Sequence, residues 1–356
     1  MRSVALKVSS VVKHYGAVKA LDGVSFEVYE GEYFAIIGPS GSGKSTLLKC
    51  IAGLEKPDKG DIIIFGRRVN ELPPERRGVG LIFQEIHLFP HMTVRGNVLY
   101  PAVVRGVERA SEAVRDVLSS LSVELKARNF PRELSLGEQQ KVALARTLAS
   151  QSKLVLMDEP YGSMDPRTAE LLRYEVRRLA KSLGLTVIHV THNQEEAMAV
   201  ADRIAVMRRG RIEQIGEPVD LYLRPRSLFV ARFVGGENNF LEGRVAGSKA
   251  PFTAIDVGSC LLWGWGEVND EKAVLAIRPE KLRFAADGLL EGIVEAREFL
   301  GKTYKYLVKL DDGRVLIVKT RDKVEVGSRV RLSFNLEDAV VLPYPREGLE
   351  EAIRYE

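Results

Sequence analysis

A glycine-rich loop over residues 38–46 constrains the fold of this chain more than any other stretch. It reads Gly-Pro-Ser-Gly-Ser-Gly-Lys-Ser-Thr and fits the phosphate-binding pattern GxxxxGK(S/T). That pattern requires a strand before it and a helix after it. The apolar run 33–37 predicts a buried strand, and residues 46–52 predict a helix that Gly53 ends. The loop therefore predicts a nucleoside triphosphate site at a strand-to-helix turn.

The residue types in this loop suit the binding of ATP phosphates. Glycines let the backbone wrap an anion with its N–H groups, and the following helix adds partial positive charge at its N-terminus. We expect Lys44 to reach the β and γ phosphates and Ser45 to offer its hydroxyl to Mg²⁺. The other loop residues expected at the nucleotide are Gly38, Pro39, Ser40, Gly41, Ser42, Gly43 and Thr46. A glycine-rich turn that matches by chance is the alternative, and the flanking strand and helix disfavour it.

Composition narrows the class of protein further. The chain has 356 residues, enough for two domains, and its formal charge of +4 gives no support to nucleic-acid binding. No apolar run reaches membrane-spanning length and no signal peptide is recognisable, so we expect a cytosolic chain. Cys50 and Cys260 lie far apart in sequence, which favours reduced thiols over a disulfide.

Hydrophobic patterning predicts an α/β architecture for residues 1–235. Apolar strands alternate with helices, which indicates a parallel sheet covered on both faces, and residues 4–13 and 24–28 alternate like antiparallel strands. Residues 93–150 have helical periodicity and predict an inserted helical subdomain, with breaks expected at Pro101, Gly106 and Pro131.

The pattern changes over residues 236–356. Short alternating strands, including a hairpin formed by 304–310 and 314–319, predict a small all-β barrel domain. Residues 347–356 are rich in charge, and we expect them to form a mobile tail.

Acidic and polar residues follow the predicted strands of the first domain. Asp158 and Glu159 come directly after the apolar run 154–157, where ligands collect in parallel sheets. We expect Asp158 to hold Mg²⁺ and Glu159 to act as the base for the attacking water; a solvated acidic loop is the alternative. Gln84, at another strand end, could touch the metal, and His192 could bond the γ-phosphate.

Two further positions have open alternatives. Ser135 and Glu138 form a capping-box pattern at a helix start, but a helix start with Gly137 is also an anion site, one that could serve the nucleotide of another chain. Tyr15, at a predicted strand end, could stack on adenine or pack on its own sheet. His189, inside an apolar strand, is expected in the core.

Together these motifs, in this order, resemble the ATP-binding subunits of ABC transporters over residues 1–235. The resemblance implies adenine stacking by Tyr15, a Q-loop glutamine at Gln84, a catalytic glutamate at Glu159, a D-loop aspartate at Asp165 and a switch histidine at His192. It also implies a head-to-tail homodimer in which Ser135 and Gly137 of one subunit close on the ATP bound by the other.

The sequence departs from the family pattern in two places. The usual LSGGQ signature has Leu136 in place of a glycine and Glu138 in place of the glutamine, which puts the affinity of dimer closure in doubt. The D-loop stretch 163–165 reads Ser-Met-Asp, where Ala-Leu-Asp is common.

Other resemblances concern the partners and the solute. The stretch 84–94 looks like the family's docking surface for membrane permease subunits, with packing inside the subdomain as the alternative. Residues 236–356 are similar to the TOBE-type, OB-like domain of importer ATPases that work with an extracellular solute-binding protein. Residues 239–243 and 277–280 carry this resemblance. Within that group of importers, the motifs at 295–301 and 337–342, together with Tyr306, favour polyamine, ferric-iron or phosphonate importers over sugar importers. The implied location is peripheral, on the inner face of the cell membrane.

Competing functions each lack a feature in this chain. ABC-type ATPases that act on nucleic acid usually carry coiled-coil or zinc insertions between the loop and the signature, and none is recognisable here. Soluble translation-type factors normally have two ATPase cassettes, and this chain has one. A simple kinase would leave Glu159, Ser135 and His192 without roles.

Overall fold

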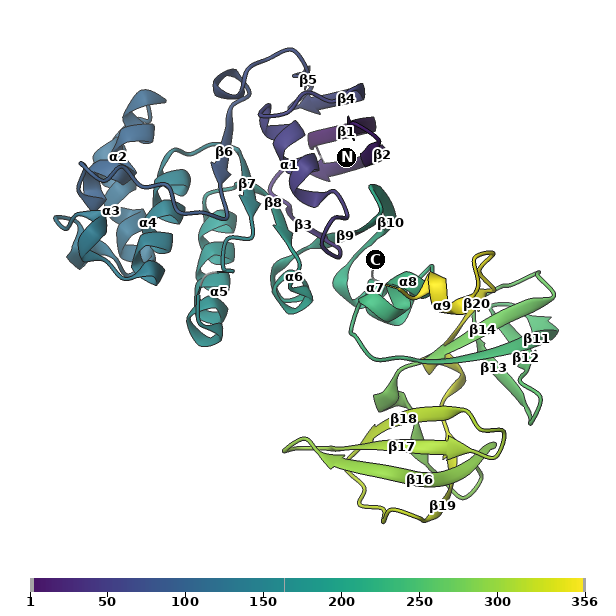
Figure 1. Ribbon diagram of the computed structural model, residues 1–356. Helices are drawn as coiled ribbons and strands as arrows, with labels where there is room; N and C mark the ends of the chain where they lie inside the picture. The colour runs from purple at the N-terminus through teal and green to yellow at the C-terminus, as the bar shows by residue number, and fades with distance from the viewer. Residues whose placement is uncertain (1–2, 163, 355–356) are drawn as a thin grey trace. The chain divides into compact units, whose positions relative to one another are not determined.

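The computed structural model describes residues 3–162 and 164–354, and every statement about structure below concerns these residues. Ser163, part of the predicted D-loop, lies outside them. The chain divides after Pro218 into two compact units (Figure 1).

The first unit is built on a six-stranded sheet. Its strand order is β10-β9-β3-β8-β7-β6, in which β10 is antiparallel to β9 and all other neighbours are parallel. This confirms the predicted parallel sheet. The strands are β3 (Tyr33–Ile37), β6 (Val79–Ile82), β7 (Leu154–Asp158), β8 (Thr186–Thr191), β9 (Arg203–Arg208) and β10 (Arg211–Gly216).

Both faces of this sheet are buried, because alternate residues of its strands enter two different cores. In β7, Val155 and Met157 belong to one core, and Leu154 and Leu156 belong to the other. A strand with apolar residues on both faces reads as a continuous apolar run in the sequence. The site residues therefore cannot lie along the strands and are confined to the strand ends.

A second, antiparallel sheet covers one face. It has the order β2-β1-β4-β5, with β1 (Val4–Tyr15), β2 (Val18–Tyr29), β4 (Lys59–Ile64) and β5 (Arg67–Arg68). The predicted antiparallel strands are thus confirmed, although β2 begins earlier than expected. The helix α1 (Lys44–Ala52) contacts β2, β7 and β8 and so lies between the two sheets.

Helices cover the other face. Here α6 (Gln194–Val200) contacts β3 and β8, and it packs against α5 (Pro166–Ser182). The apolar stripe of α5 enters the same core as Val155, with Leu172 and Val176 fully or almost fully buried. Two of these helices begin at side-chain caps: Asp165 caps α5 and Asn193 caps α6.

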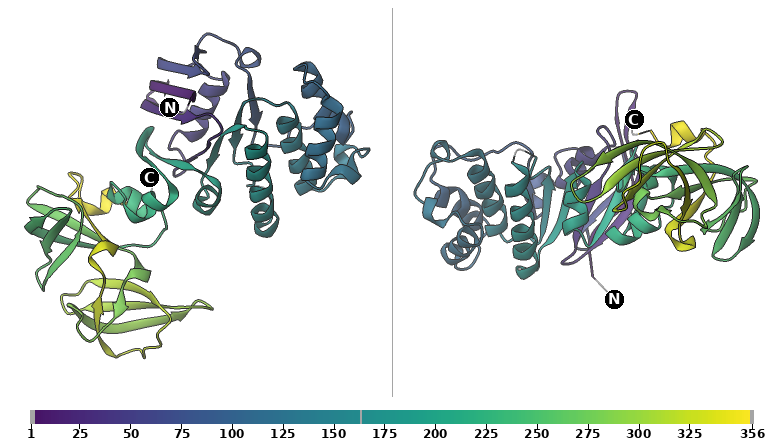
Figure 2. Two further views of the ribbon diagram at one scale, coloured as in Figure 1. Left: turned by 180° about the vertical axis from the view of Figure 1, so that it is seen from behind. Right: turned by 90° about the horizontal axis from the view of Figure 1, so that it is seen from below.

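The predicted helical subdomain is present beside β6 (Figure 2). It contains α2 (Val94–Val104), α3 (Ala110–Ser120) and α4 (Leu136–Ala149), with the 3₁₀ turns η2 (Glu124–Lys126) and η3 (Pro131–Glu133) between α3 and α4. A further 3₁₀ turn, η1 (Pro74–Arg76), precedes β6. The expected break at Pro101 is wrong, because Pro101 lies inside α2. Proline removes only its own N–H donor, and its carbonyl still accepts from the Arg105 backbone N–H at 3.1 Å.

The second unit contains two β-sheets. One is a closed barrel with the order β11-β12-β13-β20-β14, which confirms the predicted barrel; the other has the order β15-β19-β16-β17-β18 and was not foreseen as a separate sheet. The barrel strands are β11 (Asn239–Lys249), β12 (Phe252–Asp256), β13 (Leu261–Trp265), β14 (Lys272–Ile277) and β20 (Ala339–Pro343). The second sheet has β15 (Arg283–Phe284), β16 (Leu290–Phe299), β17 (Tyr304–Leu310), β18 (Val315–Thr320) and β19 (Arg329–Ser333). The predicted hairpin is β17–β18.

Short helices complete this unit: α7 (Pro218–Leu223), α8 (Leu228–Phe233), α9 (Leu349–Ala352) and the 3₁₀ turns η4 (Pro279–Lys281) and η5 (Leu336–Asp338). Leu228 and Ala231 of α8 pack in one cluster with barrel residues such as Val274 and Leu342. The contact division after Pro218 thus falls at the first residue of α7 and precedes α8. The domain boundary expected after Gly235 stays a prediction.

The expectation of a mobile charged tail over 347–356 is wrong for its helical part. Ala352 of α9 is 4% exposed and packs in the same cluster as Leu228 of α8, with Leu349 and Ile353 partly buried beside it. These three residues have the spacing of one helix face. The prediction failed because the charged residues around this short apolar stripe dominate the composition of the segment.

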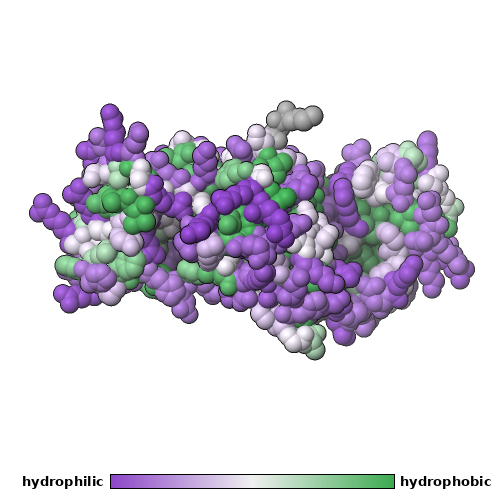
Figure 3. Space-filling model, turned by 90° about the horizontal axis from the view of Figure 1, so that it is seen from above, coloured by the Kyte–Doolittle hydropathy of each residue, from purple (hydrophilic) through white to green (hydrophobic). Residues whose placement is uncertain are grey.

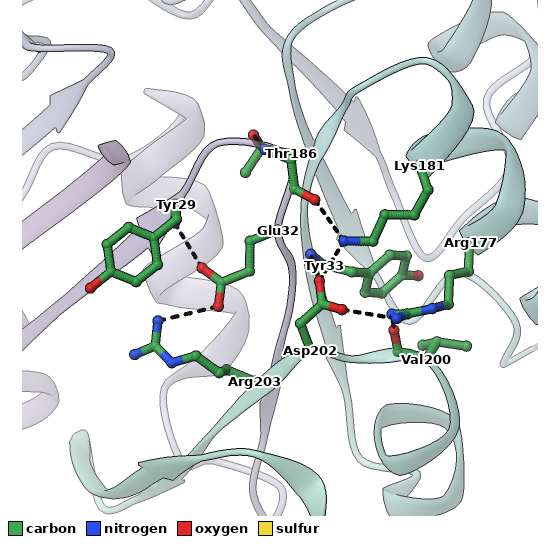
Figure 4. Close-up of polar contacts among 10 residues, drawn as sticks. Tyr29, Glu32, Tyr33, Arg177, Lys181, Thr186, Val200, Asp202 and Arg203 are labelled. Atoms are coloured by element: carbon green, nitrogen blue, oxygen red, sulfur yellow. Dashed lines mark hydrogen bonds and ion pairs between the residues drawn. The ribbon is translucent and has the colours of Figure 1, made fainter. Parts of the chain in front are cut away.

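A polar network ties the amino-terminal ends of β3, β8 and β9 together (Figure 4). The Asp202 carboxylate accepts from the Tyr33 backbone N–H at 2.8 Å, from Arg177 at 2.8 Å and from Lys181 at 2.6 Å. The Arg177 guanidinium also donates to the carbonyl of Val200. This network lies at the sheet end opposite the phosphate loop, so we assign it to stability.

Hydrophilic side chains cover most of the face drawn in Figure 3, and hydrophobic ones gather in separate patches between them. Across the described residues, no helix has both the length and the apolar character that crossing a bilayer would require.

Candidate functional site

The loop 38–46 connects β3 to α1, and two of its glycines are required by packing. A Cβ atom on Gly38 would lie 2.3 Å from the Met207 carbonyl oxygen, and one on Gly43 would lie 2.3 Å from the Ala20 carbonyl oxygen. Gly43 also has a φ of +98°, which side chains rarely allow. The glycine pattern therefore reflects a tight backbone path that leaves N–H groups available to an anion.

Lys44 is the first residue of α1 and points back into the loop. Its ammonium donates to the carbonyl oxygens of Gly38 and Pro39, each at 2.8 Å. Burial lowers the pKa of Lys44, and the nearby carboxylates of Glu159 and Asp158 oppose that effect. The structure thus holds a buried cation in the centre of the loop, as an anion site requires.

Ser45 and Asp158 are brought together from distant parts of the sequence. The Ser45 hydroxyl donates to Asp158 Oδ1 at 3.1 Å, where β7 ends beside the start of α1. Burial raises the pKa of Asp158, while the bond from Ser45 lowers it. Two oxygen donors at the edge of a phosphate site fit Mg²⁺, which is usually held by one or two protein oxygens plus phosphates and water.

Glu159 and His192 form the second close pair. Glu159 Oε1 lies 2.8 Å from His192 Nδ1 and accepts from the His192 backbone N–H at 3.0 Å. The Glu159 side chain is 13% exposed, whereas the His192 side chain is 67% exposed. Glu159 has a φ of +47°, so its backbone turns sharply at the end of β7. A fixed carboxylate with one accessible face can act as a base.

A cavity of about 570 Å³ opens beside this pair, lined in part by Glu159, His192, Tyr161, Arg173 and Glu195. It lies between α5, α6 and the turn after β7.

Gln84 and Tyr15 are placed less firmly than the pairs above. β6 ends at Ile82, and Gln84 follows in an exposed turn; no hydrogen bond of its side chain is found in the described part of the chain. Tyr15 ends β1 and is 45% exposed, with the Lys13 ammonium 5.4 Å from its ring centroid. The structure leaves the Tyr15 ring accessible.

Ser135, Gly137 and Asp165 make no hydrogen bond to the phosphate loop in the part of the chain that the structure describes. Ser135 caps α4, which packs against α2 and α3 (Figure 1). The capping box is confirmed: the Ser135 hydroxyl accepts from the Glu138 backbone N–H at 3.3 Å, and Glu138 Oε2 accepts from the Ser135 backbone N–H at 2.8 Å. A Cβ atom on Gly137 would lie 3.5 Å from Met164 Cε. Gly137 therefore lies beside the start of α5, which Asp165 caps.

Sequence reasoning missed two polar residues at the site. Thr191, the last residue of β8, is buried with its hydroxyl 3.4 Å from Glu159 Oε2. Glu196, in the first turn of α6, is buried with Oε2 at 2.9 Å from that hydroxyl. The sequence signal for Glu196 is an acidic residue three positions after an Asn N-cap, a pattern that also suits an ordinary helix start. His189 is fully buried, as predicted, and both cysteines are free thiols, as predicted.

Comparison with known proteins gives two family matches. Residues 21–162 match the family described as ABC transporter, and residues 275–342 match the family described as TOBE domain.

Curated relatives align along nearly the whole chain. A spermidine/putrescine import ATP-binding protein of Bacillus cereus is 38% identical over 95% of this chain and 98% of its own length. One from Rubrobacter xylanophilus is 35% identical over 96% and 94%. An uncharacterized ABC transporter ATP-binding protein of Escherichia coli is 39% identical over 88% of both chains.

Solved structures match the first part of the chain. The ATP-binding cassette MJ0796, in a dimeric post-hydrolysis state bound to ADP and Pi, is 32% identical with a TM-score of 0.54, covering 60% of this chain and 98% of its own. The cassette MJ1267 in its ADP conformation is 29% identical with a TM-score of 0.58, covering 66% and 99%.

Proposed function

This chain belongs to the ATP-binding proteins of ABC transporters and is an ATPase; from that premise we propose that it drives a membrane importer of polyamines. The observation that supports the motor role most strongly is the placement of Glu159 and His192 beside the Ser45–Asp158 pair and the phosphate loop. The solute is inferred from relatives named for spermidine and putrescine import, which favour polyamines over sugars, ferric iron and phosphonate.

In this proposal the described residues divide the work of hydrolysis. Lys44 and the backbone N–H groups of the loop bind the phosphates, and Ser45 and Asp158 would hold Mg²⁺. Mg²⁺ supplies neutralisation of phosphate charge when bound. Tyr15 stacks on adenine from the exposed end of β1, and Gln84 reaches the metal from its turn.

Glu159 takes the proton of the attacking water. Its Oε1 is engaged by His192, so Oε2 is the oxygen that keeps a lone pair for that proton. An ionised Glu159 only accepts hydrogen bonds, so the His192 Nδ1–H donates and Nε2 is left to face the γ-phosphate. His192 thus links the base to the phosphate.

We further propose that two copies of the chain sandwich two ATP molecules. Ser135 and Gly137 lie at the start of α4 and make no described hydrogen bond to the phosphate loop of their own chain. Such a helix start can bind the ATP of a second copy, and Asp165 at the start of α5 lies on the same proposed interface. The similar cassette MJ0796 is dimeric in its post-hydrolysis state, which supports this arrangement.

The permease partner would dock on the stretch 84–94. A cavity of about 410 Å³ opens there, lined in part by His87, Phe89, Tyr100 and Arg146. Phe89 and Tyr100 pack edge to face with centroids 5.3 Å apart, and the Arg146 guanidinium lies 5.5 Å from the Phe89 centroid. An aromatic, open groove suits a short helix of another protein. Docking there would place the chain on the inner face of the membrane, with an extracellular solute-binding protein as an indirect partner.

The motor role is tested with purified Glu159→Gln. This change keeps the shape and removes the base, so we expect ATP binding to persist, turnover to fall at least about 100-fold, and an ATP-bound dimer to accumulate on size exclusion. Glu112→Gln, which changes an exposed glutamate of α3, is the matched control. Turnover of Glu159→Gln equal to that of the parent would remove the base assignment.

The solute is tested by uptake in cells that lack this chain. Restoring the parent chain should restore uptake of labelled spermidine or putrescine, and restoring Glu159→Gln should not. Uptake of a labelled sugar, ferric iron or phosphonate that follows the chain instead would replace the polyamine proposal and leave the ATPase intact.

A further inference from the structure

A buried hydroxyl lies between two carboxylates at the end of β8. Thr191 Oγ1 lies 2.9 Å from Glu196 Oε2 and 3.4 Å from Glu159 Oε2, and it accepts from the Asn193 backbone N–H at 3.0 Å. Thr191 is fully buried, and the Glu196 side chain is 8% exposed. The contact reaches Oε2, the one oxygen of Glu159 that His192 does not engage.

The Thr191 hydroxyl has one hydrogen and two carboxylate neighbours, so it can donate a hydrogen bond to only one of the two carboxylates. All contacts are favourable when the Glu196 carboxyl carries a proton and donates it to Thr191 Oγ1, while the Thr191 hydroxyl donates to Glu159 Oε2. Burial, the largest cause, raises the pKa of Glu196, and the Glu159 charge raises it further; Thr191, Arg173 and His192 oppose this.

No lysine or arginine pairs with Glu196 within 4 Å among the described residues. Its nearest ring nitrogen is His189 Nε2, at 3.8 Å. Burial lowers the pKa of His189 to about 3, so that ring is neutral near pH 7 and does not supply a counter-charge. The environment of Glu196 therefore suits a hydrogen-bonding carboxyl better than an ion-paired carboxylate.

We propose that Thr191 and Glu196 are positioning residues for hydrolysis: the Thr191 hydroxyl, held by Glu196 from α6, fixes the second oxygen of the Glu159 carboxylate. The proposal rests on the proposed role of Glu159 as the base. With His192 on Oε1 and Thr191 on Oε2, the carboxylate plane is fixed before the water arrives. The end of β8 and the start of α6 thus orient a residue that the end of β7 carries.

The first test removes and restores the hydroxyl. Thr191→Val keeps the shape of the side chain, and we expect kcat to fall about 10- to 100-fold with KM for ATP nearly unchanged, since misplacing a reacting group costs rate rather than binding. Thr191→Ser, which keeps the hydroxyl, should remain within about threefold of the parent. Thr186→Val is the matched control, because it removes another buried hydroxyl of β8, one that accepts a hydrogen bond from the Gly31 backbone N–H. Thr191→Ser as slow as Thr191→Val would overturn the proposal.

The second test separates hydrogen bonding from charge at Glu196. Glu196→Gln keeps a donor toward Thr191 and should stay near the parental kcat, whereas Glu196→Leu should lose about as much as Thr191→Val. If both variants are equally slow, or if only KM rises, Glu196 does not hold Thr191 through a hydrogen bond and its proposed positioning role is wrong.

A double-mutant cycle makes the two proposals distinguishable. In single-turnover measurements, adding Thr191→Val to Glu159→Gln should cost no further rate, because the group to be positioned is already disabled. An additional tenfold loss would overturn the positioning role while leaving Glu159 as the base. Parental turnover of Glu159→Gln alone would instead remove the base assignment itself.

Discussion

Lys44 is the residue of the phosphate loop from which we expect the largest contribution to nucleotide binding. Its ammonium is buried and donates hydrogen bonds to two carbonyl oxygens of the loop. These bonds hold the ammonium and the loop backbone in place in the absence of phosphate. Charge-assisted bonds to phosphate are about twice as strong as neutral ones. We therefore expect Lys44 to govern nucleotide binding rather than the chemical step alone.

We expect Lys44→Ala to weaken ATP binding at least about tenfold, or about 1.4 kcal/mol, because the phosphates lose their buried cation. The dissociation constant of a fluorescent ATP analogue measures this. Lys56→Ala removes an exposed cation paired with Glu71 and is the control. An unchanged dissociation constant for Lys44→Ala would contradict the proposed phosphate site.

Asp202 makes a different kind of contribution, to stability. Burial alone would raise the pKa of its carboxyl, but hydrogen bonds from Lys181, the Tyr33 backbone N–H and Arg177 lower it below its ordinary value. A lowered pKa means that the folded state favours the ionised form. The stabilisation is therefore present above the unfolded pKa of about 4 and is lost as the pH falls through the folded value.

We expect Asp202→Asn to lower the free energy of unfolding by about 1–3 kcal/mol at pH 7, and the difference from the parent to shrink below about pH 4. Urea unfolding across pH measures both. Asp61→Asn breaks an exposed pair with Arg68 and should cost at most about 1 kcal/mol. A difference that grows toward low pH would contradict the assigned role.

Where candidate residues follow strand ends, sequence patterns predicted which of them lie close together. Asp158, Glu159 and His192 each come after an apolar run, and parallel strands bring such positions to one edge. The contacts of Thr191 and Glu196 could not be predicted in this way. They depend on how α6 rotates over β8, which tertiary packing decides.

At the scale of elements, the start of α4 carries the departure from the family signature. Glu138 Oε2 accepts from the Ser135 backbone N–H at 2.8 Å and lies 3.1 Å from the Ser135 hydroxyl. The first of these bonds lowers the pKa of Glu138, so the carboxylate is charged near pH 7. In the proposed dimer it places a negative charge, and a competing acceptor, beside the ATP of the second copy.

We expect Glu138→Gln to strengthen dimer closure. In the Glu159→Gln background it should lower the ATP concentration for half-maximal dimer severalfold, because glutamine can keep the cap without the charge. Light scattering against ATP concentration measures this. Glu133→Gln changes the matching residue of the 3₁₀ turn just before α4, which accepts from the Phe130 backbone N–H, and should have no effect. Weaker closure would show that Glu138 assists the interface.

Helices and strands with a long hydrophobic pattern were predicted correctly. Two helices were predicted wrongly because a single proline or a few charged residues dominated the local sequence. The proline in α2 suggested a break, yet the packing of α2 on α4 stabilises the helix beyond the bond that Pro101 removes. The charges around α9 suggested a mobile tail, although Ala352 is buried. Both errors come from contacts with distant residues, which local propensity does not contain.

At the scale of the whole molecule, the two units have separate cores. Both core clusters of the first unit end before residue 216, and the main cluster of the second unit begins at Leu241. The order of motifs predicted two domains. The position of the division was harder to predict, because α7 and α8 are helical like the first unit while their contacts divide them from it.

We expect a fragment ending at Gly235 to fold cooperatively and bind ATP, because it keeps both clusters of the first unit. Calorimetry and nucleotide binding measure this. Leu228→Ser in the fragment should reduce its aggregation, since truncation removes the barrel residues that Leu228 packs against. A fragment without a cooperative transition would show that the chain needs its second unit to fold.

The packing of α8 also has a consequence for synthesis. Its apolar side is covered by β14, β20 and α9, and the last two of these emerge about 100 residues after α8 itself, which takes about 5 to 20 seconds at ordinary rates of translation. During that interval the nascent chain carries an uncovered hydrophobic helix behind an already complete ATPase core. A ribosome-associated chaperone that shields residues 228–233 would therefore improve the yield of the full chain.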